Sequence, residues 1–328
     1  MTSSRLPAHR LSSLTAAAVT GTLLLAGCGT GQDGTSAEAG GKEASGTRTV
    51  TDAKGTEVKV PAAPERVVTL SEPTLDAALS LGFQPVGATS GRGQQTVSSY
   101  LTEKAGKAEI VATVAEPDLE KLARLRPDLI LLDETVGSKR VMDKLRAIAP
   151  TVLTAELKAG WKKALLSTAD ALNKREKAEK WLEKFEEDVR GTRSGLGSNA
   201  KAETSVIRWQ EGGPSVVGKG EGHVGSTLAA LGLTRPKGQQ GESLGRSEPV
   251  SLEKLDTIDG DWLFFGTLED AASGRKALKE ARKVPNFERL NAVERDHVAV
   301  IEGSAWNSAG GPIAARTVLK DVKRNLTP

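Results

Sequence analysis

The sequence has few of the residues that build metal centres and disulfides. Its 328 residues include one cysteine, three histidines and one tyrosine, and aromatic residues make up 3%. A single cysteine can form neither an internal disulfide nor a thiolate metal cluster. His9 lies in a segment that we expect to be removed, which leaves His223 and His297. Two imidazoles are too few for a transition-metal cage based on histidine, so we expect no cofactor and no protein-held metal.

An excess of charge of one sign is also missing. The chain has 45 basic and 42 acidic residues, and without Arg5 and Arg10 of the removable segment the balance is 43 to 42. This excludes a nucleic-acid-binding protein that works through net charge. With 38% hydrophobic and 27% charged residues, the composition is typical of a soluble globular body, and the length suffices for one large domain or two ordinary ones.

Residues 1–27 have the pattern of a secretory signal peptide. Arg5 and Arg10 precede an uncharged stretch from Leu11 to Gly27, which is too short and too weakly apolar for a transmembrane helix. The stretch ends in Leu25-Ala26-Gly27-Cys28. This end resembles a bacterial lipobox, in which cleavage precedes the cysteine and its sulfur is acylated, as with palmitate. The alternative is a chance cleavage site beside an unrelated cysteine. We expect Cys28 to anchor the protein to the outer face of the cell membrane.

Residues 28–46 predict a flexible tether. From Gly29 to Gly46 the chain consists mainly of Gly, Ser, Thr, Ala and charged residues, without Leu, Ile, Val or an aromatic. Such a composition favours a flexible linker over a packed element. The tether would let the folded body reach a partner at the membrane.

Strand-like and helix-like segments alternate after the tether. A hairpin around Gly55 comes first, and apolar runs then predict short strands between helices. In the first half, strands are expected at 67–70, 85–88 and 129–132, and helices at 74–81, 119–125 and 141–148. This alternation predicts βαβ units and mostly parallel sheets.

A short internal repeat indicates two similar lobes. Residues 119–122 and residues 252–255 both read Leu-Glu-Lys-Leu. In each half an aspartate follows six residues later, as Asp128 and Asp261, and an apolar strand comes next. The shared order of helix, spacing, aspartate and strand is more specific than the four-residue match alone.

A helical connector is expected between the lobes. Apolar residues recur at helical spacing from Trp161 to about Arg190, and residues 173–175 (Asn-Lys-Arg) form a candidate break. About 30 helical residues would span roughly 45 Å. The expected organisation is therefore an N-terminal lobe at 47–160, a single long connector at 161–192 and a C-terminal lobe at 193–328.

The body, residues 47–328, resembles the iron-siderophore, haem and cobalamin substrate-binding proteins of ABC importers. The resemblance is carried by the order of several segments along the whole chain: the lipobox, residues 64–68, 81–87 and 119–130, Trp161, and residues 306–312. It implies an α/β fold of two Rossmann-like lobes bridged by a helix, with the ligand in the cleft at the C-terminal ends of the strands. It also implies a receptor that is not an enzyme. The expected partners are a ferric siderophore and a dimeric ABC permease, and we expect a monomer.

Three tryptophans are candidate ligand contacts. Trp209 ends a strand and Trp306 follows one, both beside glycines, where large aromatic side chains have little core to fill. We therefore expect these two to line the cleft. Trp161, at the start of the connector, is either a cleft residue or a core residue.

Polar candidates are Arg92, Arg208 and His223. Arg92 lies in the glycine-containing loop after residues 85–88, where it is either solvated or a donor to chelate oxygens. Arg208 precedes Trp209 on a strand, so the two side chains should face opposite ways; if Trp209 faces the cleft, Arg208 does not. His223 lies in a glycine-rich loop that could touch ligand. Because no dense basic cluster is visible, the sequence favours a neutral or cationic hydroxamate chelate, whose own oxygens would hold the iron.

Other ligands and one other protein class remain open. Haem usually requires an axial His or Tyr, for which only His223 or Tyr100 is present; cobalamin is a further alternative. The Gly220–Gly225 pattern matches a dinucleotide fingerprint but lacks a convincing strand before it. A Gly-x-Ser-x-Gly match at Ser243, with His297 as base, would make an exported serine hydrolase, although no strand precedes Ser243.

Glu120 and Glu253 hold matching places within the repeated motif. The resemblance implies that one glutamate per lobe meets arginines on the two subunits of the permease. The alternative is a solvated helix face on which each glutamate has a neighbouring lysine.

Overall fold

The computed structural model describes residues 46–134, 140–156, 158–220, 222–241 and 247–328. The expected signal peptide, Cys28, Ser243 and all of the expected tether except Gly46 lie outside the described residues. Within the described part, no helix has the length and apolar character needed to cross a membrane.

The N-terminal lobe is built on a parallel sheet. It follows a hairpin of β1 (Thr47–Thr51) and β2 (Glu57–Pro61), which pair antiparallel. All neighbours in the five-stranded sheet pair in parallel, in the order β5-β4-β3-β6-β7. Its strands are β3 (Val67–Thr69), β4 (Gly87–Thr89), β5 (Glu109–Ala112), β6 (Leu129–Asp133) and β7 (Thr151–Ala155). Every residue of β6 is buried, as expected for a parallel sheet that helices cover on both faces.

Short helices connect these strands. Leu129 and Leu131 of β6 contact one apolar core, whereas Ile130 and Leu132 contact the core on the opposite face. Helix α1 begins with a capping box in which Ser71 and Thr74 satisfy each other's backbone. The helical elements of this lobe are α1 (Glu72–Ser80), the 3₁₀ turn η1 (Ser99–Leu101), α2 (Thr102–Ala105), α3 (Leu119–Arg124) and α5 (Met142–Ile148).

The second sheet repeats the strand order of the first. Its order is β10-β9-β8-β11-β12, so in each sheet the first strand is central, with the second and third on one side and the fourth and fifth on the other. Strands β8, β11 and β12 are parallel, whereas β9 and β10 are antiparallel to their neighbours. The difference arises because a tight hairpin replaces the βαβ crossover between β8 and β9. The strands are β8 (Thr204–Gln210), β9 (Gly213–Val216), β10 (Glu248–Pro249), β11 (Trp262–Gly266) and β12 (Val298–Val300).

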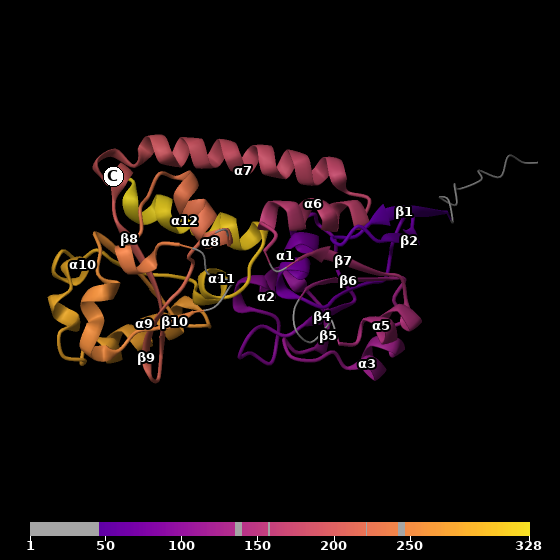
Figure 1. The fold of residues 1–328 in the computed structure, drawn as a ribbon, viewed down its shortest axis with the longest axis horizontal. Helices are drawn as coiled ribbons and strands as arrows, with labels where there is room; N and C mark the ends of the chain where they lie inside the picture. Colours follow the sequence, from indigo (N-terminus) through magenta and orange to yellow (C-terminus); the bar gives the residue numbers. More distant parts are fainter. Residues whose placement is uncertain (1–45, 135–139, 157, 221, 242–246) are drawn as a thin grey trace, which may run out of the picture. The chain divides into compact units, whose positions relative to one another are not determined.

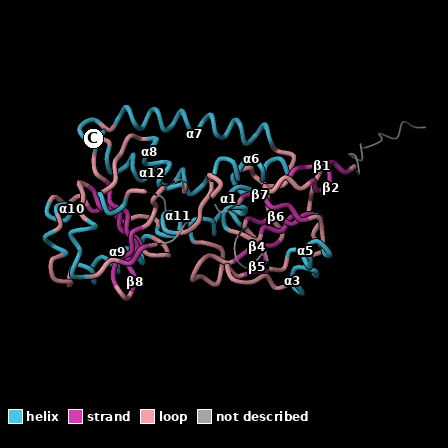
Figure 2. Tube along the Cα trace, viewed as in Figure 1, coloured by secondary structure: helices cyan, strands magenta, loops and turns pink. Residues whose placement is uncertain are grey.

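The C-terminal lobe also contains several short helices and one long one. α12 packs against both α7 and α8 (Figures 1 and 2). The helical elements are η2 (Gly197–Lys201), α8 (His223–Ala230), η3 (Lys237–Gln239), η4 (Leu252–Ile258), α9 (Ala271–Ala281), η5 (Phe287–Arg289), α10 (Asn291–Glu294), α11 (Gly303–Asn307) and α12 (Pro312–Leu326).

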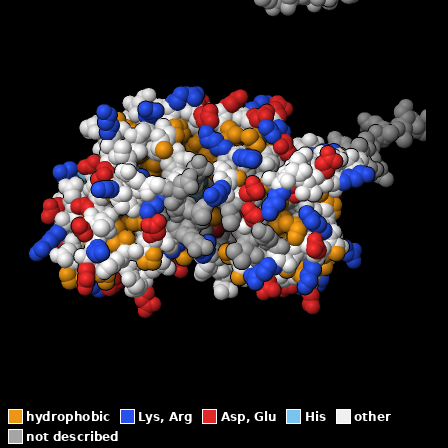
Figure 3. Space-filling model, in the orientation of Figure 1, with side chains coloured by type: hydrophobic (Ala, Val, Ile, Leu, Met, Phe, Trp, Pro, Cys, Tyr) orange, Lys and Arg blue, Asp and Glu red, His pale blue; other side chains and the backbone are white. Residues whose placement is uncertain are grey.

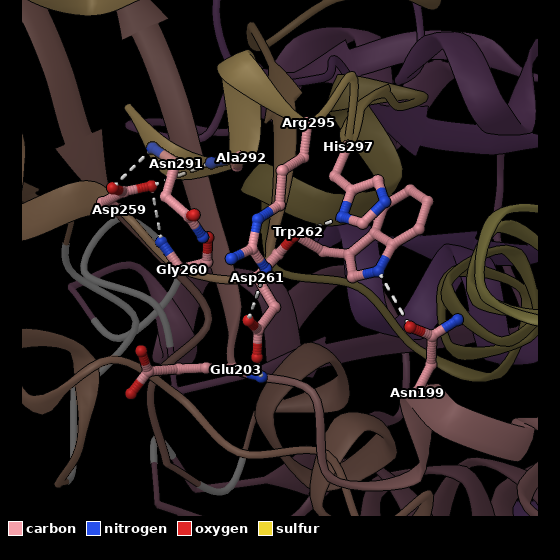
Figure 4. Close-up of polar contacts among 10 residues, drawn as sticks. All are labelled: Asn199, Glu203, Asp259, Gly260, Asp261, Trp262, Asn291, Ala292, Arg295 and His297. Carbon is pink, nitrogen blue, oxygen red and sulfur yellow. Dashed lines mark hydrogen bonds and ion pairs between the residues drawn. The ribbon is translucent and has the colours of Figure 1, made fainter. Parts of the chain in front are cut away.

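The repeated aspartate has the same structural role in both lobes. Asp128 accepts hydrogen bonds from the backbone N–H groups of Glu65 and Arg66, at 2.7 and 3.0 Å, just before β3. Asp261 accepts one from the backbone N–H of Glu203, at 2.9 Å, just before β8 (Figure 4). In each lobe the aspartate therefore ties the start of the fourth strand to the start of the first.

The connector consists of two helices, α6 (Trp161–Ala171) and α7 (Arg175–Gly195). They are separated at the expected break, where Asn173 adopts a left-handed conformation with φ of 55°. Trp181 stacks on Phe185 at 5.4 Å, and Trp161 meets both rings edge-on. Trp161 and Phe185 belong to the core of the C-terminal lobe, and Trp181 packs against the cores of both lobes, so this aromatic cluster joins the two cores. The expected α/β fold of two lobes and a helical connector is confirmed.

Charged side chains are interspersed on the face drawn in Figure 3, where basic and acidic groups lie side by side. This agrees with the near-balance of charge in the sequence.

Candidate ligand-binding site between the lobes

A pocket of about 360 Å³ lies where the two lobes and the start of α6 meet. The N-terminal lobe contributes residues at strand ends, including Asp133 of β6, Ala155 of β7 and Arg92 beyond β4. The C-terminal lobe contributes Arg208 of β8 and the segment 306–312. The position at the C-terminal ends of parallel strands is the usual ligand site of open α/β sheets, and the volume falls within the range of small-molecule sites, roughly 300–1,000 Å³.

Arg92 and Arg208 bring two guanidinium groups to this pocket from opposite lobes. Arg92 is exposed, and among the described residues it has no ion-pair partner. Arg208 is 7% exposed, and its acceptors among the described residues are all neutral: Gln210 Oε1, the Asn307 carbonyl and Ser247 Oγ. Burial, followed by the nearby charge of Arg92, lowers the pKa of Arg208. An anion in the pocket would relieve both the desolvation and the repulsion.

The pocket is not uniformly basic. Its lining also includes two lysines and three acidic residues: Lys158, Lys219, Asp133, Glu134 and Glu156. Lys219 forms an ion pair with Glu248 at 2.6 Å, and Lys54 forms one with Glu134 at 2.8 Å. The basic lining residues come from well-separated segments, so sequence inspection did not reveal them as a group.

Trp306 lines the pocket, but its ring is buried in the core of the C-terminal lobe. It is 1% exposed, it stacks on Phe264 with ring centroids 4.6 Å apart, and its Nε1 donates to Asp321 Oδ2 at 2.9 Å. It belongs to the short helix α11 rather than to a loop. Trp306 thus supports the pocket wall with a rigid ring.

Trp209 does not reach the pocket, and the expectation that it faces the cleft is wrong. It is buried on the far side of its sheet, where its ring centroid lies 5.7 Å from that of Phe265 and 5.6 Å from that of Phe287. Arg208 and Trp209 face opposite sides of the sheet, as expected for neighbours on a strand. However, Arg208 faces the pocket and Trp209 faces the core, the reverse of the expected assignment. Phe287 and the apolar core around it cover that face, and Phe287 comes from η5, a segment far from Trp209 in the sequence.

His223 and Trp161 both line the pocket and are both fixed by hydrogen bonds. His223 Nε2 lies 2.6 Å from the Ala305 carbonyl and Nδ1 accepts from the Gly310 N–H at 3.3 Å. Burial lowers the pKa of His223 to about 4, so the ring is neutral with the proton on Nε2. Trp161 Nε1 donates to Ser226 Oγ at 3.1 Å. Each ring therefore presents its surface, not a free nitrogen, to the pocket.

Neither residue considered for haem ligation has a free ligand atom. Both nitrogens of His223 are engaged, and the Tyr100 hydroxyl donates to Asp76 Oδ2 at 2.9 Å. Burial and the neighbouring carboxylates raise the pKa of Tyr100 well above its usual value, which disfavours the phenolate that would bind iron. An axial bond from either residue would first require these contacts to break.

His297 and the described part of the glycine motif have structural surroundings. His297 stacks on Trp262 at 4.3 Å, and its Nδ1 bonds to the Asp261 carbonyl (Figure 4). It precedes β12, at the end of the sheet opposite the pocket. In the glycine motif, a Cβ atom at Gly225 would lie 2.1 Å from the Gly220 carbonyl oxygen, so the glycine accommodates a tight turn of the loop.

Glu120 and Glu253 are both exposed, each in the first turn of its helix. Asp118 caps α3, and Ser251 caps the 3₁₀ helix η4. These helices lead into β6 and β11, which hold the same place in the two sheets. Among the described residues neither glutamate has an ion-pair partner.

A family model described as a periplasmic binding protein matches residues 67–305. The chain belongs to the periplasmic binding protein family. Members of this family bind substrates for transport and are not enzymes, so the hydrolase alternative fails; its candidate nucleophile, Ser243, lies outside the described residues.

Named relatives of this periplasmic binding protein cover nearly its whole length. It is 30% identical over 309 residues to the Bacillus subtilis protein named "Probable siderophore-binding lipoprotein YfiY", covering 92% of this chain and 93% of that one. It is 27% identical over 311 residues to the iron(3+)-hydroxamate-binding protein FhuD of B. subtilis, covering 92% and 93%.

A solved relative has the same fold. The crystal structure of Staphylococcus aureus SirA with staphyloferrin B matches with a TM-score of 0.68 and 26% identity, covering 85% of this chain and 98% of SirA. Siderophore binding is thus a recurring property among the proteins that this chain resembles.

Proposed function

We propose that this protein captures a ferric siderophore in the pocket between its lobes and delivers it to an ABC importer. The observation that carries the proposal is the pair Arg92 and Arg208, which face one pocket from opposite lobes without a carboxylate partner among the described residues. A chelate that binds iron through its own oxygens needs no iron ligand from the protein. The relatives' siderophores support this ligand class.

The charge of the pocket favours an anionic chelate over the hydroxamate that the sequence suggested. A guanidinium group donates two parallel hydrogen bonds to oxygen anions. Arg208 is largely desolvated and lies near Arg92, so an anion between the two gains more than a neutral ligand would. Carboxylate or catecholate oxygens on the surface of a ferric complex supply that charge. A cationic chelate would instead add to the existing repulsion.

Glu120 and Glu253 are proposed as the contacts to the permease. One exposed carboxylate per lobe, in matching places of two similar sheets, suits a partner with two similar subunits. Exposed charges of this kind set orientation and association rate more than affinity. Lys121 flanks Glu120 but forms its ion pair with Asp118, at 3.9 Å. Among the described residues Lys254 forms no ion pair with Glu253.

Acylation of Cys28 is proposed to hold the receptor at the membrane. The lipobox-like sequence and the apolar-poor tether support this, as does the name of the lipoprotein relative. Two or more acyl chains are needed for stable anchoring.

A tryptophan-fluorescence titration tests the proposed ligand class. Trp161 and Trp306 line the pocket, so an iron chelate bound there should quench their emission. The panel comprises ferric dicitrate and ferric enterobactin as anions, ferrioxamine B as a cation, ferrichrome as a neutral hydroxamate, and haemin and cobalamin. Saturable quenching by an anionic ferric chelate is expected. Saturation only by haemin or cobalamin would contradict the proposal.

A further inference from the structure

Two buried carboxylates of α1 lie where the N-terminal lobe meets the C-terminal lobe. Asp76 is 0% exposed and Glu72 is 7% exposed. Both accept hydrogen bonds from the segment 308–314, whose first part lines the pocket. These contacts cross directly between the lobes, independently of the connector.

Asp76 supplies the N-terminal cap of α12. This helix begins after Gly311, and no side chain at the N-cap position satisfies its first N–H groups. Instead, the Asp76 carboxylate accepts from the backbone N–H groups of Gly311 at 3.0 Å, Ile313 at 2.7 Å and Ala314 at 3.0 Å. A carboxylate at a helix N-terminus satisfies unpaired amides and complements the helix dipole. The last helix of one lobe is therefore completed by the other lobe.

Two glycines allow this close approach. A Cβ atom at Gly311 would lie 3.1 Å from the carboxyl carbon of Asp76. At Gly310 it would lie 2.3 Å from Ala314 Cβ and 3.0 Å from the His223 ring. Gly310 and Gly311 therefore allow the chain to pass close to α1 and α8 just before α12 begins at Pro312.

Further hydrogen bonds accompany this contact. Glu72 Oε2 accepts from Ser308 Oγ at 2.7 Å. Ser99 Oγ donates to Glu302 Oε1 at 2.9 Å, and the Tyr100 backbone N–H donates to Ser304 Oγ at 3.1 Å. The lobes are thus joined by a polar interface that reaches the pocket lining at Ser308. Asp76, with three backbone donors and Tyr100, makes the largest number of these bonds.

We propose that Asp76 is a positioning residue: it holds the pocket-lining segment 308–312 against the N-terminal lobe and so sets the width of the pocket before ligand binds. The inference rests on the proposed function only in taking this pocket as the binding site. Its test uses no ligand, so its failure is distinguishable from failure of the ligand assignment.

The test measures the distance between the lobes by pulsed electron paramagnetic resonance. Cys28 is the only cysteine, so the full chain with Cys28→Ser accepts spin labels at Glu103→Cys in α2 and Lys279→Cys in α9, both exposed positions. The labelled parent should give one narrow distance. With Asp76→Asn, an amide N–H₂ group meets backbone N–H donors, and we expect the narrow distance to be lost to a broader, longer distribution.

Asp321→Asn is the matched control. Asp321 is also buried, at 5% exposed, but its partners Trp306 and Arg324 belong to its own lobe. This variant should lower the melting temperature and retain the parent's distance. If Asp76→Asn also retains the parent's distance, the proposal is overturned.

A second variant keeps the proposal testable if Asp76→Asn does not fold. Gly311→Ala places a methyl group against Asp76 and should shift the distance to a larger value. Gly191→Ala is its control, since no atom lies within 4 Å of a Cβ there. An unchanged distance in Gly311→Ala would equally overturn the proposal.

Discussion

Arg92 and Arg208 approach one another across the pocket, and the charge of Arg92 adds to burial in lowering the pKa of Arg208. A buried guanidinium with a second positive charge nearby costs free energy unless an anion lies close to it, and Arg208 is buried while Arg92 is exposed. The pair is therefore better explained as half of a binding site than as a stabilising contact.

Replacing Arg208 should weaken binding of an anionic ferric chelate selectively. Truncating one partner of a buried charged contact costs at least about 2 kcal/mol, or roughly thirtyfold in affinity. We expect Arg208→Gln to lose about this much for ferric dicitrate or ferric enterobactin, and Arg92→Gln to lose less because Arg92 is exposed. Isothermal titration calorimetry measures both. Arg282→Gln, which breaks a surface ion pair with Glu288, is the control and should bind as the parent does. If the variant with both Arg92→Gln and Arg208→Gln binds these chelates as tightly as the parent does, the two arginines are not ligand contacts.

Substitutions of Trp209 and Trp306 should have different effects: the first should lower the free energy of unfolding, and the second should weaken ligand binding. Trp209→Ala removes a ring from the far core and should cost about 3–5 kcal/mol of folding free energy without a specific loss of ligand affinity. Trp306→Phe keeps a ring on Phe264 but loses the hydrogen bond to Asp321, and should weaken binding because the pocket wall loosens. Chemical denaturation and calorimetry on each variant give the two quantities. A Trp209→Ala protein that is folded but unable to bind would return Trp209 to the site.

Ionisation of the buried Glu72 should lower the free energy of unfolding as pH rises. Burial, more than any other factor, raises the pKa of Glu72 to about 7 from an ordinary value of 4.5. The folded state therefore holds its proton more tightly than the unfolded state, and stability decreases between about pH 4.5 and pH 7. At pH values above 7, the free energy of unfolding is lower by at most about 3 kcal/mol.

Glu72→Gln should raise the melting temperature at pH 8 and leave it nearly unchanged at pH 5. Ser98 lies close enough to Glu72 to oppose the effect of burial on its pKa, yet among the described residues neither Glu72 Oε1 nor Ser98 Oγ makes a well-formed hydrogen bond. An amide N–H₂ in place of the carboxyl group can donate to Ser98 Oγ. Exposed Glu57→Gln serves as the reference. A Glu72→Gln protein less stable than the parent at pH 8 would show that the ionised carboxylate stabilises the fold.

Charge reversal at Glu120 and Glu253 should abolish uptake without changing ligand affinity. Both side chains are exposed and lie in the first turns of α3 and η4, so Lys is tolerated structurally while repelling arginines on the permease. Radioactive iron uptake in cells that depend on this importer, together with titration of the purified double variant, checks both statements. Glu103→Lys with Glu280→Lys reverses one exposed charge per lobe elsewhere and should transport normally. Normal uptake by the Glu120/Glu253 variant would refute the docking assignment.

Cys28→Ala should release the receptor from the membrane. The expected signal is loss of acyl labelling and a shift of the protein from the membrane to the soluble fraction. A serine change within the tether, Ser36→Ala, should have no effect. Retained labelling in the Cys28 variant would show that another residue is acylated.

The sequence predicted the fold well because the buried parallel strands are continuous apolar runs. Strand β6 and the repeated Leu-Glu-Lys-Leu and Asp positions marked the lobes, and the Asn-Lys-Arg segment marked the break in the connector. The short strands β5, β7, β9 and β10 were not predicted. β9, for example, includes a glycine and a proline and has no period-two pattern of its own.

The site was harder to predict than the fold. Arg92 and Arg208 were recognised singly, but their proximity depends on how the lobes meet. Trp209 was misplaced because the rings that bury it, Phe265 and Phe287, come from distant segments of the sequence, β11 and η5. The carboxylates Glu72 and Asp76 were not singled out at all, since an acidic residue on a short amphipathic helix is ordinarily solvated. Only the tertiary contact with α12 shows that they are buried.

Locating the iron tests the central claim most directly. A crystal of the protein with the anionic ferric chelate that quenches its fluorescence most strongly would give an anomalous difference map at the iron absorption edge. The account predicts one iron peak in the pocket between the lobes, with chelate oxygens bonded to both Arg92 and Arg208. An iron peak outside this pocket, or in it without contact to either arginine, would contradict the account.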